Sequence, residues 1–499
     1  MDKKSYIVGV DIGSSQVVVA VGTMEDNGQV KILGLETQPV GDSVKNGSIQ
    51  NVVNLGQAIK QAKIELEKTL SIRIQEAYVG ISGESAYCAT YSDHVFIRNQ
   101  ADGCITHEDL RELDERMLKV TPGNSDEILE RIPQRYIIDD HQEVSDPVGR
   151  YGKKLSAQYL FLLCNNQHKE RICRALHNAD MRLLKLCITP AVLPELLLSN
   201  DEREYGAAIV DIGSELTDIS IVHSGHLCYF ASLPIGGSAI NKDLLTFVQT
   251  TKEEIEKTKR RYGSVVPQEI PDNTTVAIKM PGRPNRVVLH RNIAEVTEAR
   301  VKDIARFVQN EIREAKFSSK ITCGMVLTGG TALLNGIDEL FSKETNNSAR
   351  IGETLYGIDE ESRQNIASYS QSAAVAILLY GAKSKPCSTI EILQTATPTP
   401  PVPPAPAPTP APAPTPVPVP TSVTPPTPQP STSVTPPTLQ GTTTPMPAKE
   451  EPKREEPKRE EPATHEPPQQ ITTKGKGFFQ KFTDWMDGVI KGNNEQYLE

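Results

Sequence analysis

The sequence predicts an α/β protein of two similar lobes, followed by a disordered proline-rich linker and a C-terminal amphipathic helix. Strand and helix patterns alternate through residues 1–385, and 37% of the 499 residues are apolar, which permits a sizeable core. The residues Asp-Ile-Gly-Ser occur twice in similar surroundings, about 200 positions apart. The composition then changes abruptly at about Thr395. These three observations set the fold class and the order of its parts.

Each copy of Asp-Ile-Gly-Ser connects two predicted strands. The first copy lies between the apolar runs 7–10 and 17–21, and the second lies between 208–210 and 217–222. Apolar runs on both sides of a short turn that contains glycine are typical of β-hairpins. One Asp-x-Gly turn is ordinary turn chemistry, whereas two in matching positions predict two lobes that each open with the same hairpin.

The chemistry of these turns suits a polyphosphate. Glycine lets the backbone approach closely and point N–H groups at phosphate oxygens, and serine adds hydroxyl donors. Aspartate would repel phosphate directly, so its natural role is to hold Mg²⁺ through water molecules. The pair of turns therefore predicts a clamp around one nucleotide, with Asp11 and Asp211 on the metal side. Its residues are Asp11, Gly13, Ser14 and Ser15 in the first hairpin and Asp211, Gly213 and Ser214 in the second.

A third glycine site follows an apolar strand predicted over residues 325–328. The turn reads Gly329-Gly330-Thr331, and a helix is predicted over 332–341. Such a turn would let a flat base approach the backbone. The chain has no P-loop motif, and no G-x-G-x-x-G follows a strand, so neither a P-loop nor a Rossmann site is indicated.

Proline dominates the segment that follows the globular part. Of the 38 prolines, 26 lie between residues 395 and 470, where Glu-Glu-Pro-Lys-Arg also occurs twice in succession. A segment of this composition cannot bury enough apolar surface to fold, and proline favours an extended chain. No basic PxxP motif stands out, so the segment is interpreted as a spacer and not as a ligand for SH3-type domains.

The last residues predict a short amphipathic helix over 477–491. Its apolar side chains fall on one arc, while Gln480 and Asp484 lie on the other side. The apolar face consists of Phe478, Phe479, Phe482, Trp485, Met486, Val489 and Ile490, and the lysines before or beside it are Lys474, Lys476 and Lys481. A short helix is marginal alone in water and needs a surface on which to fold. The long spacer favours a peripheral membrane anchor over a helix docked on the parent domain.

Composition limits the classes of function and of cellular location that this chain can have. The net charge of −10 gives no broad electrostatic reason to bind nucleic acid. The eight cysteines form no CxxC pair, so we expect reduced thiols in a cytosolic protein, and His223 and His226 are expected at a hairpin tip. No apolar run approaches the roughly 20 residues that span a bilayer, and no signal-peptide pattern is present. We therefore expect contact with a membrane only through the tail.

The three glycine sites resemble the phosphate-1, phosphate-2 and adenosine motifs of the actin/Hsp70 ATPase superfamily. Within it, the chain resembles the FtsA family, most specifically at residues 79–83, 133–140, 146–149 and 233–244. The resemblance implies an actin-like (duplicated ribonuclease H-like) fold with a small insert subdomain, called 1C. It implies lobe 1 (1A) at 1–84 and 166–205, subdomain 1C at 85–165, lobe 2 (2A/2B) at 206–385, the linker at 386–473 and the membrane-targeting helix at 474–499.

The same resemblance assigns further nucleotide contacts. A Glu and a Lys three residues apart precede Tyr262-Gly263, and the superfamily pattern implies that Glu256 and Lys259 contact the adenosine. On a helix, positions i and i+3 share a face, so both could reach one ribose. Gly236 and Gly237 are implied as cofactor-binding residues. Where many relatives have a run of glycines, this chain has Glu215, which would add negative charge near the phosphates.

The resemblance also implies a function. A member of this family would bind ATP and Mg²⁺, assemble into filaments, and tether the FtsZ ring to the cytoplasmic side of the inner membrane at the division septum. It would hold the C-terminal peptide of FtsZ, contact anionic lipid and help to recruit downstream division proteins. No residue between the two turns stands out as positioning an attacking water, so the sequence leaves ATP hydrolysis and the catalytic residues open. A pilus-assembly relative and a sugar kinase of the same superfamily remain as alternatives.

Overall fold

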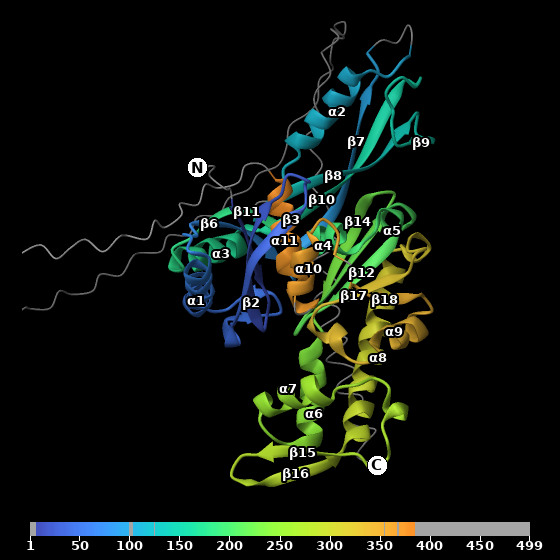
Figure 1. Cartoon of the computed structure of the whole chain (residues 1–499). Coiled ribbons are helices and arrows are strands. Elements are labelled where there is room, and N and C mark those ends of the chain that lie inside the picture. Colours follow the sequence, from blue (N-terminus) through green and yellow to red (C-terminus); the bar gives the residue numbers. More distant parts are fainter. Residues whose placement is uncertain (1–5, 99–102, 124, 354, 367–368, 385–499) are drawn as a thin grey trace, which may run out of the picture. The chain divides into compact units, whose positions relative to one another are not determined.

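The computed structural model describes residues 6–98, 103–123, 125–353, 355–366 and 369–384 (Figure 1). The proline-rich linker and the predicted helix over 477–491, with all of the apolar and lysine positions named above, lie outside the described residues.

Lobe 1 is built on a five-stranded sheet. Its strands are β1 (Tyr6–Ile12), β2 (Gln16–Met24), β3 (Val30–Pro39), β6 (Glu76–Ile81) and β11 (Arg182–Ile188), in the order β11-β6-β1-β2-β3. The first three form an antiparallel meander, and β6 and β11 continue the sheet in parallel. Helices cover both faces of this sheet, and accordingly most residues of β1 and β2 are apolar and buried.

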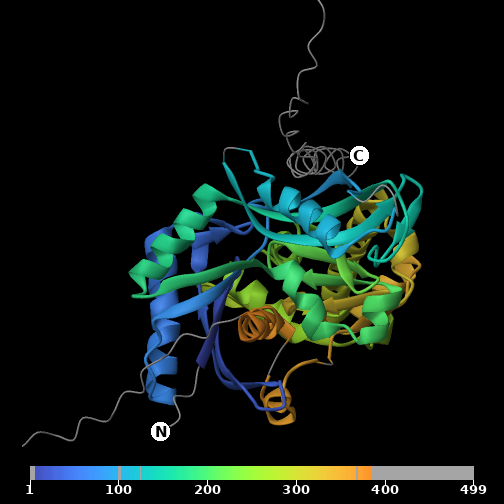
Figure 2. The ribbon, with the colours of Figure 1, turned by 90° about the horizontal axis from the view of Figure 1, so that it is seen from above.

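Helices cover this sheet on its two faces (Figure 2). On one side lie α1 (Val52–Leu70) and α3 (Asn166–Asn178), and on the other lie α4 (Thr189–Leu197) and α11 (Ser372–Lys383). Helix α1 begins at a true cap, because the Asn51 side chain accepts from the N–H groups of Val53 and Asn54.

Lobe 2 repeats the same sheet. Its strands are β12 (Ala207–Ile212), β13 (Thr217–His223), β14 (His226–Leu233), β17 (Met325–Thr328) and β18 (Ala349–Ile351), in the order β14-β13-β12-β17-β18. Again an antiparallel meander is continued by two parallel strands. This identical topology confirms the predicted duplication. His223 and His226 flank a turn in which Ser224 and Gly225 have φ of 52° and 75°, as predicted.

An insert with its own sheet lies between β6 and α3. It contains β7 (Ala86–Phe96), α2 (His107–Lys119), β8 (Asp126–Ile138), β9 (Gln142–Val144) and β10 (Lys154–Asn165), with strand order β7-β10-β8-β9. It has a hydrophobic cluster of its own that includes Val95, Leu113 and Phe161. All of these elements fall within the predicted range 85–165.

A mostly helical part of lobe 2 follows β14. It consists of α6 (Gly237–Val248), α7 (Lys252–Tyr262), the hairpin β15 (Thr275–Met280) and β16 (Arg283–Leu289), and the long helix α8 (His290–Glu314). The remaining elements are β4 (Val44–Lys45), β5 (Ser48–Ile49), α5 (Asn200–Tyr205), α9 (Ile337–Thr345) and α10 (Glu360–Asn365). Short 3₁₀ turns lie at Gly41–Ser43, Pro267–Glu269, Ser318–Lys320, Gly330–Leu333 and Tyr369–Gln371.

The end of the globular part differs from the sequence prediction. Lobe 2 was predicted to extend to residue 385, yet α11 packs on β1, β2 and β6 of lobe 1. Close approach explains the placement, because a Cβ added at Gly9 would lie 2.9 Å from the Leu378 nitrogen. Helix α11 is apolar on nearly all sides and can be buried only between layers. In the part of the chain that the structure describes, no helix combines the length and apolar character needed to cross a bilayer.

Candidate nucleotide site

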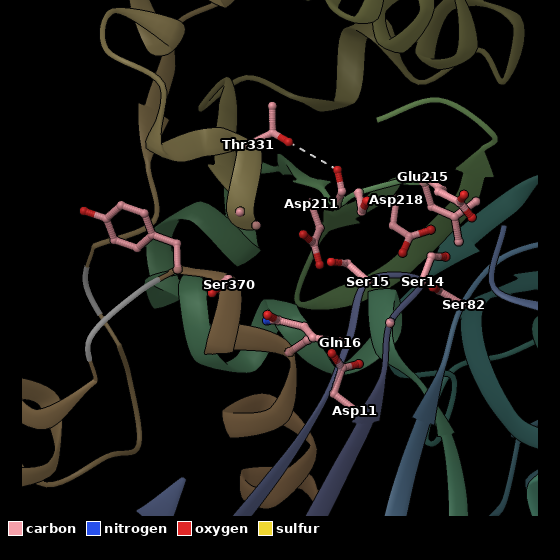
Figure 3. Close-up of a pocket in the computed structure, with 18 of the residues that line it drawn as sticks. Asp11, Ser14, Ser15, Gln16, Ser82, Asp211, Glu215, Asp218, Thr331 and Ser370 are labelled. Atoms are coloured by element: carbon pink, nitrogen blue, oxygen red, sulfur yellow. Dashed lines mark hydrogen bonds between the residues drawn. The ribbon is translucent and has the colours of Figure 1, made fainter. Parts of the chain in front are cut away.

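A cavity of about 340 Å³ lies where the turn of β1–β2 faces the turn of β12–β13 (Figure 3). Its volume is in the range of small-molecule binding sites, and it takes residues from both lobes. Twelve of the residues predicted to bind the cofactor line it: Asp11, Gly13, Ser14, Ser15, Asp211, Gly213, Ser214, Glu256, Lys259, Gly329, Gly330 and Thr331.

The two turns close in the same way. The N–H of Gly13 donates to the carbonyl of Gln16 at 3.0 Å, and the N–H of Gly213 donates to the carbonyl of Leu216 at 2.9 Å. This corrects one detail of the prediction, because each glycine uses its own N–H inside the turn. Backbone donors for a phosphate would therefore come from the residues after the glycines, beginning with Ser14 and Ser214.

Gly236 and Gly237, which were predicted to bind the cofactor, lie behind the second turn and are not among the residues that line the cavity. The N–H of Gly237 donates to the carbonyl of Gly213 at 2.9 Å, and the N–H of Ser238 donates to the carbonyl of Ser214 at 2.7 Å. The Thr331 hydroxyl donates to the same Gly213 carbonyl at 3.2 Å. The start of α6 thus uses its unpaired N–H groups to hold the turn from behind.

Three carboxylates face one another inside the cavity. Asp11 comes from β1, Asp211 from β12 and Asp218 from β13. Burial, and then the charge of Asp218, raise the pKa of Asp11 to about 7. Burial, followed by the charges of Asp218 and Asp11, raises the pKa of Asp211 well above its usual range. The protein groups around these carboxylates therefore compensate little of their negative charge.

Asp218 was missed by the sequence reading. It lies directly opposite Asp211 in the antiparallel register of β12 and β13, so both side chains project to the same face of the sheet. Burial raises the pKa of Asp218 to about 6, against hydrogen bonds from Ser232 and Ser82 that lower it. The signal that could have found it is the single acidic residue of the strand Thr217–His223.

A hydrated Mg²⁺ fits this arrangement. Among the described residues, no three His, Cys, Asp or Glu side chains are placed to hold one metal ion together. Mg²⁺ commonly keeps several waters and binds one or two carboxylates together with substrate phosphates. The pKa values of Asp11 and Asp211 are raised because their ionised forms are destabilised, and a bound cation would stabilise those ionised forms.

Glu256 and Lys259 line the cavity from α7. The Lys259 ammonium lies 2.7 Å from the Glu256 carboxylate and donates to the Gly237 carbonyl at 3.2 Å. Asn241 and Arg260 also donate to Glu256, at 2.6 and 2.7 Å. Burial alone would raise the pKa of Glu256, but these partners, Lys259 first, lower it to about 2. Glu256 is therefore a fixed anion that can accept hydrogen bonds from hydroxyl groups.

The third glycine turn, Gly329-Gly330-Thr331, lines the cavity next to Asp211. Gly329 has φ of 88°, and a Cβ there would lie 2.3 Å from Asp211 Oδ1, so only glycine fits beside this carboxylate. The helix predicted over 332–341 begins later than expected. Gly330–Leu333 forms a 3₁₀ turn, and α9 begins at Ile337 after Gly336, whose φ of 76° interrupts the helix.

Some lining residues gave no local signal. Tyr369 and Ser370 enter the cavity from the turn before α11, far along the chain from the first hairpin, which ends at Met24. Arg260 also lines the cavity, and no role was predicted for it. Long-range packing of α11 on lobe 1 places the first two residues, and nothing in their own sequence indicates it.

The family model described as "Cell division protein FtsA" matches residues 208–376, and that described as "SHS2 domain inserted in FTSA" matches residues 83–162. The second range covers nearly all of the insert sheet described above.

Curated relatives support the same family. The chain is 29% identical to the cell division protein FtsA of Pseudomonas aeruginosa over 378 residues, covering 75% of this chain and 89% of that protein. It is 27% identical to FtsA of Bacillus subtilis, covering 71% of this chain and 80% of the relative.

A solved structure supports the fold. The PilM-PilN type IV pilus biogenesis complex aligns with a TM-score of 0.53 at 13% identity, covering 76% of this chain and 99% of that one. With the duplicated sheets, this confirms the predicted two-lobed actin-like fold of the globular part.

Proposed function

The chain belongs to the FtsA family of cell-division proteins, and from that premise we propose that it binds ATP with Mg²⁺ between its two lobes. One observation carries the proposal: matched Asp-Ile-Gly-Ser turns from two duplicated sheets face a single cavity, which Glu256 and Lys259 also line. Fold alone would not assign a ligand, whereas the chemistry of these particular groups does.

Each group has a role in this proposal. Asp11 and Asp211 hold Mg²⁺ through waters, and the ion compensates the charge of the carboxylates and phosphates. Ser14 and Ser214 donate to phosphate oxygens from opposite lobes. Glu256 accepts from the ribose hydroxyls, and Lys259 keeps it in place at 2.7 Å. ATP binding alone, without hydrolysis, is sufficient for the proposed function. A phosphate-release assay would decide whether the protein also hydrolyses ATP.

Assembly and attachment follow from the same proposal. A nucleotide that contacts both lobes favours one arrangement of them, and that arrangement favours head-to-tail filaments. The tail over 474–499 inserts its aromatic face into anionic lipid on the cytoplasmic side of the inner membrane, and the second lobe holds the C-terminal peptide of FtsZ. A filament presents many tails at once, so assembly and attachment reinforce each other through effective concentration.

Calorimetry with MgATP tests the nucleotide site. We expect binding to the full chain and loss of at least about 100-fold in affinity when both Asp11 and Asp211 are changed to Asn, because the ion then loses both carboxylates. Unchanged MgATP affinity in the double variant would remove the basis of the proposal.

Sedimentation with anionic liposomes tests the anchor. The full chain with ATP should pellet with the vesicles, and a chain ending at residue 473 should stay in solution. Trp485→Glu should release the protein while leaving ATP binding intact, because it places a charge on the apolar face. Gln480→Glu, which adds the same charge to the polar face, is the matched control and should still pellet.

A pilus-assembly role is the alternative with an observation behind it, namely the likeness to the PilM-PilN complex. That likeness, at 13% identity, extends to the fold only. An assay for phosphorylated sugars would distinguish the sugar-kinase alternative from the proposed function. The liposome experiment separates the pilus-assembly role, because the anchor tail is the feature on which the division assignment and that role differ.

A further inference from the structure

A small hairpin of lobe 1 reaches the cavity between the two phosphate turns. Strands β4 and β5 are joined by Asn46 and Gly47, with φ of 47° and 74°, which makes a tight two-residue turn. Gly47 lines the same cavity as Asp11 and Asp211. No nucleotide role was predicted for this hairpin from the sequence.

The tip of this hairpin is packed against both lobes. A Cβ added at Gly47 would lie 2.7 Å from the Ser82 carbonyl oxygen of lobe 1 and 3.1 Å from the Leu216 side chain of lobe 2. On the facing side, a Cβ added at Gly83 would lie 2.7 Å from the Asn46 carbonyl oxygen. The tip therefore has little room to move without a shift of one lobe against the other.

Two successive backbone donors of the tip point to the two phosphate turns. The N–H of Asn46 donates to Glu215 Oε2 at 2.6 Å, and the N–H of Gly47 donates to the Ser14 hydroxyl at 3.3 Å. Ser14 belongs to the first turn and Glu215 follows directly on the second, and both line the cavity. The tip thus links the two turns by hydrogen bonds.

Glu215 was expected to add negative charge near the phosphates, and its hydrogen bond gives that charge a specific place. A carboxylate is the protein group closest to a phosphate in charge and hydrogen-bonding character. A terminal phosphate that approached the Asn46 and Gly47 donors would compete with Glu215 for the first of them and would be repelled by its charge. A shorter diphosphate would extend less far toward these donors.

The first turn offers an internal comparison. In the aligned motifs, the position of Glu215 is occupied in lobe 1 by Ser15, which is exposed and uncharged. The carboxylate is therefore not required for the turn itself, since the Gly13 and Gly213 turns close with the same hydrogen bond.

We propose that Glu215 is a specificity-determining residue that lowers the preference of this site for nucleoside triphosphates over diphosphates. The inference rests on the proposed nucleotide site. In the absence of a terminal phosphate, Glu215 occupies the Asn46 donor and links the lobes. A triphosphate must displace it, so binding of the terminal phosphate breaks the hydrogen bond between Glu215 and the hairpin tip.

Calorimetry with MgATP and MgADP on the full chain tests this inference through the ratio of the two affinities. Glu215→Gln keeps the size of the side chain and removes its charge, and should raise the preference for ATP over ADP by about tenfold. Glu215→Asp keeps the charge on a shorter side chain and should give no such gain. Glu204→Gln, the same change at an exposed site in α5 away from the cavity, is the matched control and should leave the ratio unchanged.

The opposing outcomes are distinct. If Glu215→Gln weakens or strengthens both nucleotides equally, Glu215 is only a structural link and the inference is wrong. A gain in Glu215→Asp equal to that in Glu215→Gln would also overturn it, because charge would then not be the cause. If the wild-type chain binds neither nucleotide, the proposed site fails together with the inference.

Discussion

The hairpin of Asp11 and the hairpin of Asp211 share four residues and one turn geometry, yet their surroundings differ. Opposite Asp11 on the neighbouring strand stands Val18, whereas opposite Asp211 stands Asp218. The second turn is supported from behind by the start of α6, and the first receives a bond from the Val40 N–H to the Ser15 carbonyl at 3.2 Å. The motif thus sets the path of the backbone, and the second strand sets the electrostatics.

The largest effect is expected when the residues opposite the two aspartates, Val18 and Asp218, are exchanged for each other's residue type. Val18→Asp places a carboxylate at a fully buried position beside Asp11, so we expect a loss of about 3 kcal/mol or more in the free energy of unfolding. Asp218→Val removes one of three mutually repelling carboxylates and should change that free energy by only about 1 kcal/mol. Denaturant unfolding measures both, with Val18→Thr as a control of similar size, and equal effects of the two exchanges would contradict the asymmetry.

The metal requirement gives the next largest effect. Asp11→Asn leaves lobe 1 with no carboxylate at this pair of strands, whereas after Asp211→Asn the opposite Asp218 remains. We therefore expect the Mg²⁺ concentration needed for half-maximal ATP binding to rise by about 30-fold in Asp11→Asn and by about fivefold in Asp211→Asn. Fluorescence titration with a labelled ATP analogue measures both, and the reverse order would show that Asp218 does not substitute.

The proposed nucleoside contacts both come from lobe 2, which gives a third comparison. Glu256→Gln should weaken ATP binding by about tenfold, because a charged acceptor of the ribose hydroxyls is lost. The matched control lies on the same helix. Glu253 and Lys257 form an exposed pair at 2.6 Å, and Glu253→Gln should leave ATP affinity unchanged. Equal affinities of the two variants would exclude the ribose contact.

The smallest effect is on pH dependence. Because the pKa of Asp11 is raised to about 7 and that of Asp218 to about 6, these carboxylates take up protons as the pH falls through this range unless a cation is bound. Mg²⁺ favours the ionised carboxylates, so MgATP affinity should fall as the pH drops from 7.5 to 5.5, and binding at pH 6.5 should release protons. Calorimetry in two buffers of different ionisation enthalpy measures the release. Asp11→Asn should reduce it, and an affinity independent of pH would argue against buried carboxylates at the metal position.

Local chemistry made much of the fold and site predictable. The turns at Gly13 and Gly213 carry their own signal, because a short glycine turn between apolar runs has few other solutions, and their repetition predicted the two sheets. Asp11, Asp211 and the Glu256–Lys259 pair followed from motif chemistry and from resemblance, and all of them line one cavity.

What sequence reading missed depends on contacts between distant segments. Placing Asp218 in the cavity requires the register of β12 against β13. Placing Gly236 behind the second turn requires the hydrogen bond from the N–H of its neighbour Gly237 to the Gly213 carbonyl. The delayed start of α9 depends on the positive φ of Gly336. The placement of α11 on lobe 1 depends on its contacts with β1, β6 and α4, which come together only after folding.

That placement has a mechanical consequence. Every residue after 384 is joined to the body through α11, and α11 packs against β1, which carries Asp11 next to its last residue. Tension applied to the tail would therefore reach lobe 1 first and act beside its phosphate turn. Because nearly every side chain of α11 is buried, a pull along the tail must shear the helix out of its layer as a unit.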